Sequence, residues 1–267
     1  MFQIGAIGAG HMGMAILDAA IEHNLAKPSD ILVYEIEPER RREAKSRGFV
    51  AAGSEAEVFS NSCLVMLAVS PQACEELLIK LTKMAARLDK KPVIINIMAG
   101  ISSTYIRKHL GDIHVVTLMP TMGMKVGQGA AAIAYTDNVP DSELSYVMKI
   151  FYATGEVVVV EEPLLKEIVA VNGCMPGYVF YMLEAFAKEA ERQGIDYQTA
   201  LRMAARGFIG AAQQVLEGAS PKEMISKVCT PGGLTAKGVE FFEESHLDQT
   251  LAGGMKASVK RGYELAR

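Results

Sequence analysis

The sequence predicts an α/β domain built on a mostly parallel sheet, followed by an all-α domain. Two observations predict this class. Short β-branched runs alternate with helical patterns over the first 160 residues, and the strand signals then stop. The chain has 267 residues, a length that favours two domains at about 150 residues each. We therefore expect an N-terminal domain over residues 1–160 and a helical domain over residues 161–267.

Seven segments of the first half have the length and the bounding turn residues of strands. They are Phe2 to Ile7, Ile31 to Glu35, Leu64 to Val69, Val93 to Ile97, Val115 to Met119, Ala130 to Tyr135 and Val157 to Val160. Between the first two runs, helical spacing places on one face Met12, Ala15, Ile16, Ala19 and Ala20. Strands that alternate with helices in this way indicate a doubly wound sheet covered on both faces.

The C-terminal hundred residues are helical in pattern. One apolar helical face is formed by Val179, Met182, Leu183, Phe186 and Ala190. Ser220 and Pro221 have the residue types of an N-cap and a first helical position. A bundle this small, with apolar faces made of alanine and methionine, leaves much apolar surface exposed unless it packs on a partner. We expect a homodimer through this half, with a higher oligomer as an extension.

Composition narrows the classes of function. The 27 basic and 31 acidic side chains give a net charge of −4, without a block of like charges, which argues against nucleic acid and anionic membranes as partners. No apolar run reaches the 18 or more residues that a membrane span needs. The four cysteines form no CxxC pair and have no ligand spacing with the five histidines. We therefore expect no metal site, reduced thiols and a cytoplasmic location.

A glycine motif directly after the first predicted strand carries the strongest chemical signal. Residues 8–13 read Gly-Ala-Gly-His-Met-Gly and open the first predicted helix, which is the arrangement of a dinucleotide-binding turn. Gly8 suits the tight turn, Gly10 lets a pyrophosphate approach the backbone, and Gly13 lets the helix pack closely on the strand. His11 and Met12 then lie beside the phosphates. A glycine-rich turn without a ligand is the alternative interpretation.

An acidic residue at the end of the second predicted strand bears on the cofactor. Glu35 lies 22 residues beyond Gly13, where a carboxylate accepts hydrogen bonds from the adenine-ribose hydroxyls and repels a 2′-phosphate. Glu37 and Glu39 add to this acidity. The position favours NAD(H), with NADP(H) as the alternative, because the arginines at 40–42 could fold back onto a phosphate.

Later segments resemble the pyrroline-5-carboxylate reductase family, and the resemblance spans nearly the whole chain. In the first half, Ala68 to Gln72 is similar to the family's Ala-Val-Lys-Pro-Gln, Ile97 to Ser102 to its Ile-Ala-Ala-Gly-Val-Ser, and Met119-Pro120 to its Met-Pro-Asn-Thr-Pro. In the second half, Gly173, Pro176 and Tyr178 match its Ser-Gly-Ser-Gly-Pro-Ala-Tyr helix, and Thr230 to Thr235 resembles its Ser-Pro-Gly-Gly-Thr-Thr loop. The common order of these segments, more than any one of them, carries the resemblance.

The resemblance implies an oxidoreductase that uses NAD(P)H to reduce the cyclic imine 1-pyrroline-5-carboxylate to proline. To the cofactor site it adds Ala68, Val69, Pro71, Ala99 and Gly100. To the substrate site it assigns Met119, Pro120, Thr230, Gly232, Gly233 and Thr235. Thr235, the catalytic candidate, would hydrogen-bond the imine nitrogen, while Gly232 and Gly233 would contact the carboxylate.

The residues of the 230–235 loop also favour such a site on physical grounds. Two glycines free the backbone to turn, and a helix pattern follows them through Val239. Bare amides at a helix start can hold a carboxylate without any arginine. An ordinary capped turn between helices is the alternative.

The departures from the family's pattern cluster where the substrate is expected. In the first half, Ser70 replaces a lysine, Thr117 an arginine, Thr121 an asparagine and Gly123 a proline. In the second half, Asn172 and Cys174 replace serines, Met175 a glycine and Gly177 an alanine. These changes leave open a related reductase for a different cyclic imine. A non-catalytic dinucleotide-binding protein is a further alternative.

Overall fold

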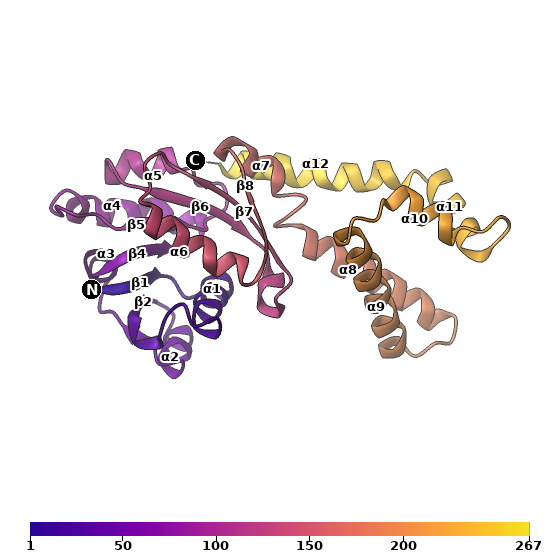
Figure 1. The fold of residues 1–267 in the computed structure, drawn as a ribbon, viewed down its shortest axis with the longest axis horizontal. Coiled ribbons are helices and arrows are strands. Elements are labelled where there is room, and N and C mark those ends of the chain that lie inside the picture. The colour runs from indigo at the N-terminus through magenta and orange to yellow at the C-terminus, as the bar shows by residue number, and fades with distance from the viewer. Residues whose placement is uncertain (267) are drawn as a thin grey trace. The chain divides into compact units, whose positions relative to one another are not determined.

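The computed structural model describes residues 1–266 and divides into two compact units (Figure 1). The sheet unit comprises Met1–Gly173 together with the chain from Ser258 onward, and the helical unit comprises Cys174–Ala257. The sequence places a boundary near residue 160, after the last strand, whereas the sheet unit continues to Gly173. The reason is that Leu165 packs against Ala132 and Ala134 of a strand, so the chain after residue 160 still covers the sheet.

The sheet has eight strands in the order β3-β2-β1-β4-β5-β6-β7-β8. They are β1 (Phe2–Ile7), β2 (Ile31–Tyr34), β3 (Val50–Ala51), β4 (Ser62–Leu67), β5 (Val93–Asn96), β6 (Val115–Pro120), β7 (Gly129–Tyr135) and β8 (Gly155–Val159). Neighbours are parallel except β6 and β7, where Leu118 lies opposite Ile133 in an antiparallel pair. The predicted fold class and all seven predicted strands are confirmed. The sequence does not predict β3, because two exposed residues at a sheet edge are too few to show the apolar–polar alternation of a strand.

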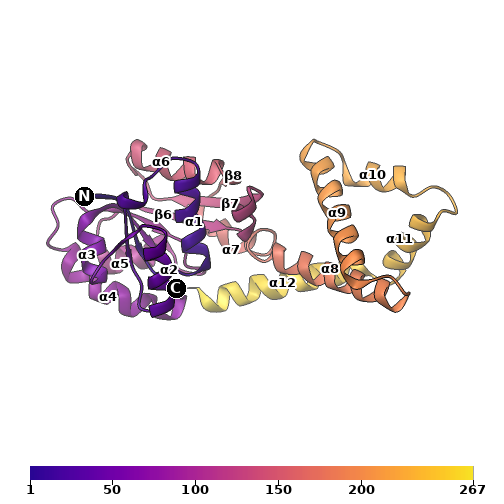
Figure 2. The same ribbon diagram turned by 90° about the horizontal axis from the view of Figure 1, so that it is seen from below.

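Helices cover both faces of the sheet (Figure 2). On one face lie α1 (His11–Glu22), α2 (Pro38–Ser46) and α6 (Asp141–Tyr152), and on the other α3 (Glu55–Asn61), α4 (Cys74–Ala85) and α5 (Ser103–Leu110). A short helix, α7 (Leu165–Ile168), follows β8. Because both faces are covered, the consecutive residues Leu64, Val65, Met66 and Leu67 of β4 are all fully buried.

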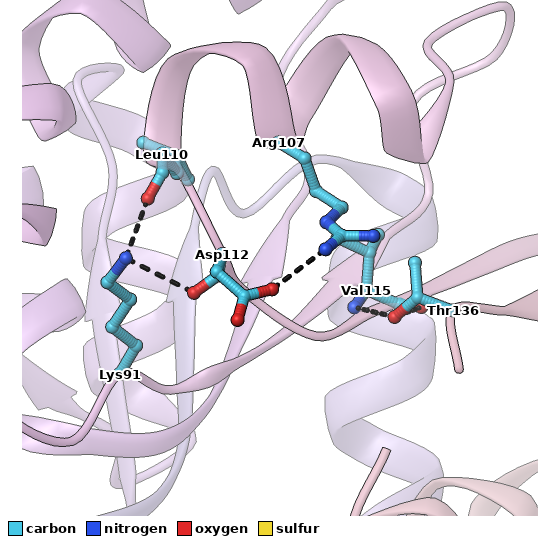
Figure 3. Close-up of polar contacts among 6 residues, drawn as sticks. All are labelled: Lys91, Arg107, Leu110, Asp112, Val115 and Thr136. Carbon is cyan, nitrogen blue, oxygen red and sulfur yellow. Dashed lines mark hydrogen bonds and ion pairs between the residues drawn. The ribbon is translucent and has the colours of Figure 1, made fainter. Parts of the chain in front are cut away.

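Side chains fasten the amino edge of the sheet, where β5 and β6 begin (Figure 3). The Lys91 Nζ donates hydrogen bonds to the carbonyl oxygens of Leu110, at 3.0 Å, and Asp112, at 3.1 Å, and so caps the end of α5. Arg107 pairs with the Asp112 carboxylate at 2.7 Å. These contacts tie the end of α5 to the starts of β5 and β6 at the amino edge, whereas the predicted cofactor residues lie at the carboxyl edge.

The helical unit is built from α8 (Met175–Arg192), α9 (Tyr197–Leu216), α10 (Pro221–Val228), α11 (Leu234–Glu244) and the first part of α12 (Leu247–Leu265). Residue 267, the end of the predicted helical stretch, lies outside the described residues. Ser220 is the N-cap of α10 and Pro221 its first residue, as predicted. Phe186 and Phe208 join α8 to α9, with ring centroids 6.1 Å apart. Within residues 1–266 no helix is long and apolar enough to cross a membrane.

Candidate active site

The glycine turn lies between β1 and α1, and its shape depends on two glycines. Gly8 has φ +96°, and a Cβ atom placed on it would lie 2.6 Å from the carbonyl oxygen of Ala68. A Cβ atom on Gly13 would lie 3.0 Å from the Ala68 Cβ. Any larger residue at either position would push α1 away from β4. The structure therefore brings the predicted Gly8, Gly13 and Ala68 together.

Gly10, by contrast, is open on its outer side. It is the N-cap of α1, and the nearest atom to a Cβ placed on it is the Nη1 of Arg40, at 3.8 Å. The first amides of α1 point into this space, and no acidic residue lies in the first turn. His11 is exposed beside it, whereas Met12 is partly buried and packs against the core. The turn fits a pyrophosphate, because it offers unpaired N–H groups and no side chain that would fill the place.

Glu35 follows β2 directly and is fastened to the glycine turn. Its side chain is 6% exposed. The Oε2 accepts a hydrogen bond from the Ala9 amide at 2.6 Å, and the Oε1 accepts one from the Glu37 amide at 2.9 Å. Each carboxylate oxygen keeps a further lone pair. A fixed negative charge thus lies beside the turn, at the place where the sequence predicts the adenine ribose.

A cavity of about 140 Å³ opens next to Glu35 at the carboxyl ends of β1, β2 and β4. Its walls include Gly8, Tyr34, Glu35, Val69 and Leu77. In the strand order, β1 is followed on one side by β2 and on the other by β4, so the cavity lies where the direction of winding reverses. This is the position at which doubly wound sheets bind ligands. The walls also include Lys80, paired with Glu55 and Glu76, but most of their exposed surface is apolar, which together with the buried Glu35 carboxylate suits an adenosine.

The loop after β5 is organised by a residue that the sequence interpretation missed. Asn96 is fully buried at the end of β5. Its Nδ2 donates to the Ile101 carbonyl at 2.8 Å, and its Oδ1 accepts from the Met98 amide at 3.1 Å. Between them, Ala99 is exposed and Gly100 adopts φ +78°. The signal in the sequence was a polar residue that ends an otherwise apolar, buried strand.

The end of β6 carries the predicted Met119 and Pro120. The Asn172 Nδ2 donates to the Met119 carbonyl at 2.5 Å, which fixes the chain at the sheet's carboxyl edge. Asn172 is 7% exposed, and its Oδ1 has no partner among residues 1–266. An unpaired buried acceptor is costly, so this oxygen is a candidate for a bound donor.

Thr117, which stands where the family's pattern has an arginine, takes part in a small polar cluster. Its Oγ1 donates to the Oε1 of Glu162 at 3.2 Å. The same carboxylate accepts from the Ser103 amide at 2.6 Å and from the Ser103 hydroxyl. Glu162 therefore caps α5 and holds the segment after β8 against β6. The sequence interpretation missed this residue, because its partner Ser103 is 59 residues away along the chain.

In the helical unit, the 230–235 loop forms the turn that the sequence predicts. Gly232 adopts φ +72°, and the Gly233 amide donates to the Thr230 carbonyl at 2.8 Å. Gly233 is the N-cap of α11, so Thr235 lies in the first turn of that helix, where it is exposed. The first turn of α11 contains no acidic residue. Its bare amides are free to receive an anion.

Most of the predicted site residues thus lie along one edge. Because β1, β4, β5 and β6 run parallel, their carboxyl ends meet there. From β1 to β6, that edge carries Gly8, Gly10, Gly13, Glu35, Ala68, Val69, Pro71, Ala99, Gly100, Met119 and Pro120. The 230–235 loop belongs to the helical unit. The assignment of these residues to cofactor and substrate stays a prediction.

The fold and the glycine turn define a dinucleotide-binding protein of the doubly wound class. Residues 3–100 match the family model for NADP oxidoreductase, coenzyme F420-dependent, and residues 162–265 match that for pyrroline-5-carboxylate reductase dimerisation. The chain is 33% identical to the pyrroline-5-carboxylate reductase of Aquifex aeolicus over 93% of its length and 92% of the relative. With that of Escherichia coli it is 30% identical over 99% and 98%. The chain belongs to the pyrroline-5-carboxylate reductase family, and it is an oxidoreductase.

Solved structures agree with the fold over the full length. The pyrroline-5-carboxylate reductase from Coxiella burnetii superposes with a TM-score of 0.88 at 26% identity, covering 100% of this chain and 99% of that one. The Plasmodium falciparum pyrroline carboxylate reductase with NADP bound gives a TM-score of 0.89 at 20% identity, covering 100% and 98%. The second comparison supports the fold alone.

Proposed function

We propose that this protein reduces the cyclic imine 1-pyrroline-5-carboxylate to proline with a reduced nicotinamide dinucleotide. The observation that carries the proposal is the 33% identity to a relative named for this reaction, over 93% of the chain. The site supports it, because the open face of Gly10 and the cavity beside Glu35 suit a dinucleotide. The loops after β5 and β6 lie along the same edge of the sheet.

Bound reduced nicotinamide supplies a hydride for the carbon of the C=N bond. The chain's own residues bind and orient. The glycine turn holds the pyrophosphate, and the 96–101 loop, fixed by Asn96, positions the nicotinamide half. Gly232 and Gly233 hold the substrate carboxylate at the start of α11, and the Thr235 hydroxyl hydrogen-bonds the imine nitrogen. An iminium that is already protonated, or that takes its proton from water, needs no strong general acid, so positioning supplies most of the catalysis.

For the cofactor, we propose a preference for NAD(H), with NADP(H) as a second, weaker choice. The support is the Glu35 carboxylate, which two backbone amides hold beside the turn. A ribose with two free hydroxyls can donate to its remaining lone pairs, whereas a 2′-phosphate would meet a fixed negative charge.

For assembly, we propose a homodimer through the helical unit, in a cytoplasmic protein that binds neither nucleic acid nor membranes. An apolar groove between α8 and α9 supports the dimer, lined by Phe186, Met203, Ala204, Gly207, Phe208 and Ala211. Met203 is 70% exposed in the single chain. The four cysteines support the cytoplasmic location, because none of them forms a disulfide within residues 1–266.

The test is turnover of a substrate panel by the purified chain. It measures oxidation of NADH and of NADPH with 1-pyrroline-5-carboxylate and with a six-membered cyclic imine, and it identifies proline as the product. We expect the five-membered imine to be the better substrate, with NADH preferred. Faster turnover of the larger imine would favour the alternative that Thr117, Thr121, Cys174 and Met175 suggest. Tight NADH binding without turnover of any imine would favour a non-catalytic protein.

A further inference from the structure

Three consecutive arginines in the first turns of α2 have different surroundings. Arg41 turns back, with its Nε donating to the Glu35 carbonyl at 2.9 Å. Arg42 faces outward and makes a loose pair with Glu39, at 3.9 Å. Arg40 faces the glycine turn, where its Nη1 lies 3.8 Å from the Cβ position of Gly10. One of the three guanidinium groups is therefore placed over the turn.

Arg40 has no partner of its own within residues 1–266. Its neighbours along the helix are already engaged, since Glu39 pairs with Arg42 and Glu43 pairs with Arg47 at 2.7 Å. The Arg40 side chain is exposed, so its charge lies at the mouth of the turn. The Arg40 guanidinium and the bare amides of the helix start are two positive partners for an anion at Gly10, while the Glu35 carboxylate holds the neighbouring Ala9 amide.

We propose that Arg40 binds a phosphate group of the dinucleotide, and that this group is the pyrophosphate. The inference rests on the proposed function, because it requires a dinucleotide in the glycine turn. Gly10 is the residue at which a pyrophosphate approaches the backbone, and Arg40 lies across from it. The other phosphate to consider is the 2′-phosphate of NADP(H). It would lie beside the adenine ribose, where the negative charge of the Glu35 carboxylate would repel it.

An Arg40 contact with the pyrophosphate and one with the 2′-phosphate predict different results. The pyrophosphate is common to both cofactors, so the loss of Arg40 should weaken NADH and NADPH equally. The 2′-phosphate is present only in NADPH, so a contact there would affect that cofactor alone. An arginine–phosphate contact is charge-assisted and often bidentate, and its loss should raise the dissociation constant roughly tenfold or more.

The experiment measures the dissociation constants of NADH and NADPH by calorimetry for the full-length chain and for Arg40→Gln. Arg42→Gln is the matched control, because it removes an equal charge two residues further along α2, from an exposed side chain that pairs with Glu39. We expect Arg40→Gln to weaken both cofactors by about tenfold, Arg42→Gln to change neither by more than about twofold, and added salt to weaken the parent chain more than Arg40→Gln.

Weakening of NADPH alone would overturn the assignment to the pyrophosphate, and unchanged affinity for both cofactors would overturn any role for Arg40. Thermal unfolding of the two variants should match the parent, because both side chains are exposed. If the parent chain binds neither cofactor, the proposed function fails. If the parent chain and Arg40→Gln bind NADH equally well, only the role of Arg40 fails.

Discussion

The two units of this protein differ in how many large apolar side chains they bury. In the sheet unit, large side chains such as Phe59, Leu78 and Phe151 are almost completely buried. In the helical unit, the buried apolar residues among those described are two alanines, Ala187 and Ala200. The first unit therefore has a large core of its own, whereas the second has almost none within the single chain.

The exposed side chains of the helical unit indicate what it lacks. Phe180 is 69% exposed, Tyr181 78% and Leu234 96%. Together with the apolar groove between α8 and α9, these side chains offer apolar surface to a partner. The comparison teaches that the half that should bind the cofactor buries its own core, whereas the other half exposes apolar side chains that the proposed dimer would cover.

The largest effect is expected from a charge in the α8–α9 groove, which should separate the helical units while leaving the sheet unit intact. Met203→Glu should raise the dissociation constant of the dimer by roughly a hundredfold or more, because a carboxylate would be buried without a partner. Light scattering during gel filtration should then show monomers, with imine reduction lost. The control is Ile79→Glu, which places the same charge on an exposed apolar site of α4, where Ile79 is 58% exposed. A Met203→Glu chain that remained dimeric would contradict the proposed interface.

The second largest effect concerns the part of the site that the helical unit should supply. Thr235→Ala should lower kcat for the imine roughly tenfold to a hundredfold, because the reacting nitrogen loses a hydrogen-bonding partner. NADH affinity should stay within about twofold of the parent, because the predicted cofactor residues lie in the sheet unit. Thr235→Ser restores the hydroxyl and should restore most of the rate. Equal rates for Thr235→Ala and the parent would show that Thr235 does not touch the substrate.

Within the sheet unit, a change at Glu35 should alter the affinity for the cofactor and leave the dimer unchanged. Glu35→Ser should weaken NADH by about tenfold and leave NADPH equal or better, since a fixed charge beside the ribose is removed. Glu37→Gln is the control, as its side chain is exposed and only its amide reaches Glu35. An unchanged ratio of NADH to NADPH affinity in Glu35→Ser would refute the role of this carboxylate.

The smallest expected effect is the loss of one partly exposed ion-pair cluster in the sheet unit. Arg47 contacts Asp18 at 2.9 Å and Glu43 at 2.7 Å. Burial raises the pKa of Asp18 above its ordinary value of 3.8, and the hydrogen bond from Arg47 lowers the pKa of Glu43 below 4.5. Arg47→Met should therefore raise the pKa of both carboxyl groups. At neutral pH it should cost about 1 kcal/mol of unfolding free energy, because solvent screens these pairs.

The sign of this effect fixes its pH dependence. Because the hydrogen bond from Arg47 lowers the pKa of Glu43, the Glu43 part of the cost is present at neutral pH, and it should be lost as the pH falls through this lowered folded pKa and the carboxyl group becomes protonated. Urea unfolding of Arg47→Met and of the parent, at neutral pH and at a pH below the folded pKa of Glu43, measures how the cost changes with pH. Arg107→Met, which removes a pair with the 93% exposed side chain of Asp112, is the control and should cost less. A cost for Arg47→Met that does not depend on pH would rule out the electrostatic explanation.

Local patterns in the sequence predicted much of this structure. The glycine turn, the seven strands and the start of α10 each depend on residues that are close along the chain, and all are confirmed. The contacts that sequence reasoning missed are of two kinds, one within a loop and one between distant segments. Asn96 bonds to Met98 and Ile101 of its own loop, a local contact that the residue type alone does not reveal. Glu162 meets Ser103 only when segments 59 residues apart come together. For the arginines at 40–42 the sequence allowed a phosphate contact, but only the fold shows that Arg40 is the one that faces the glycine turn.

The central claim is that the sheet unit binds the cofactor by itself, whereas catalysis also needs a helical unit completed by its partner. The most direct measurement is the NADH dissociation constant of Met203→Glu at a concentration where that variant is monomeric, together with its rate of imine reduction. We predict an affinity within about threefold of the dimeric parent and a rate reduced by roughly a hundredfold or more. A monomer that reduces the imine at the parental rate, or one that has lost NADH binding while remaining folded, would contradict the account.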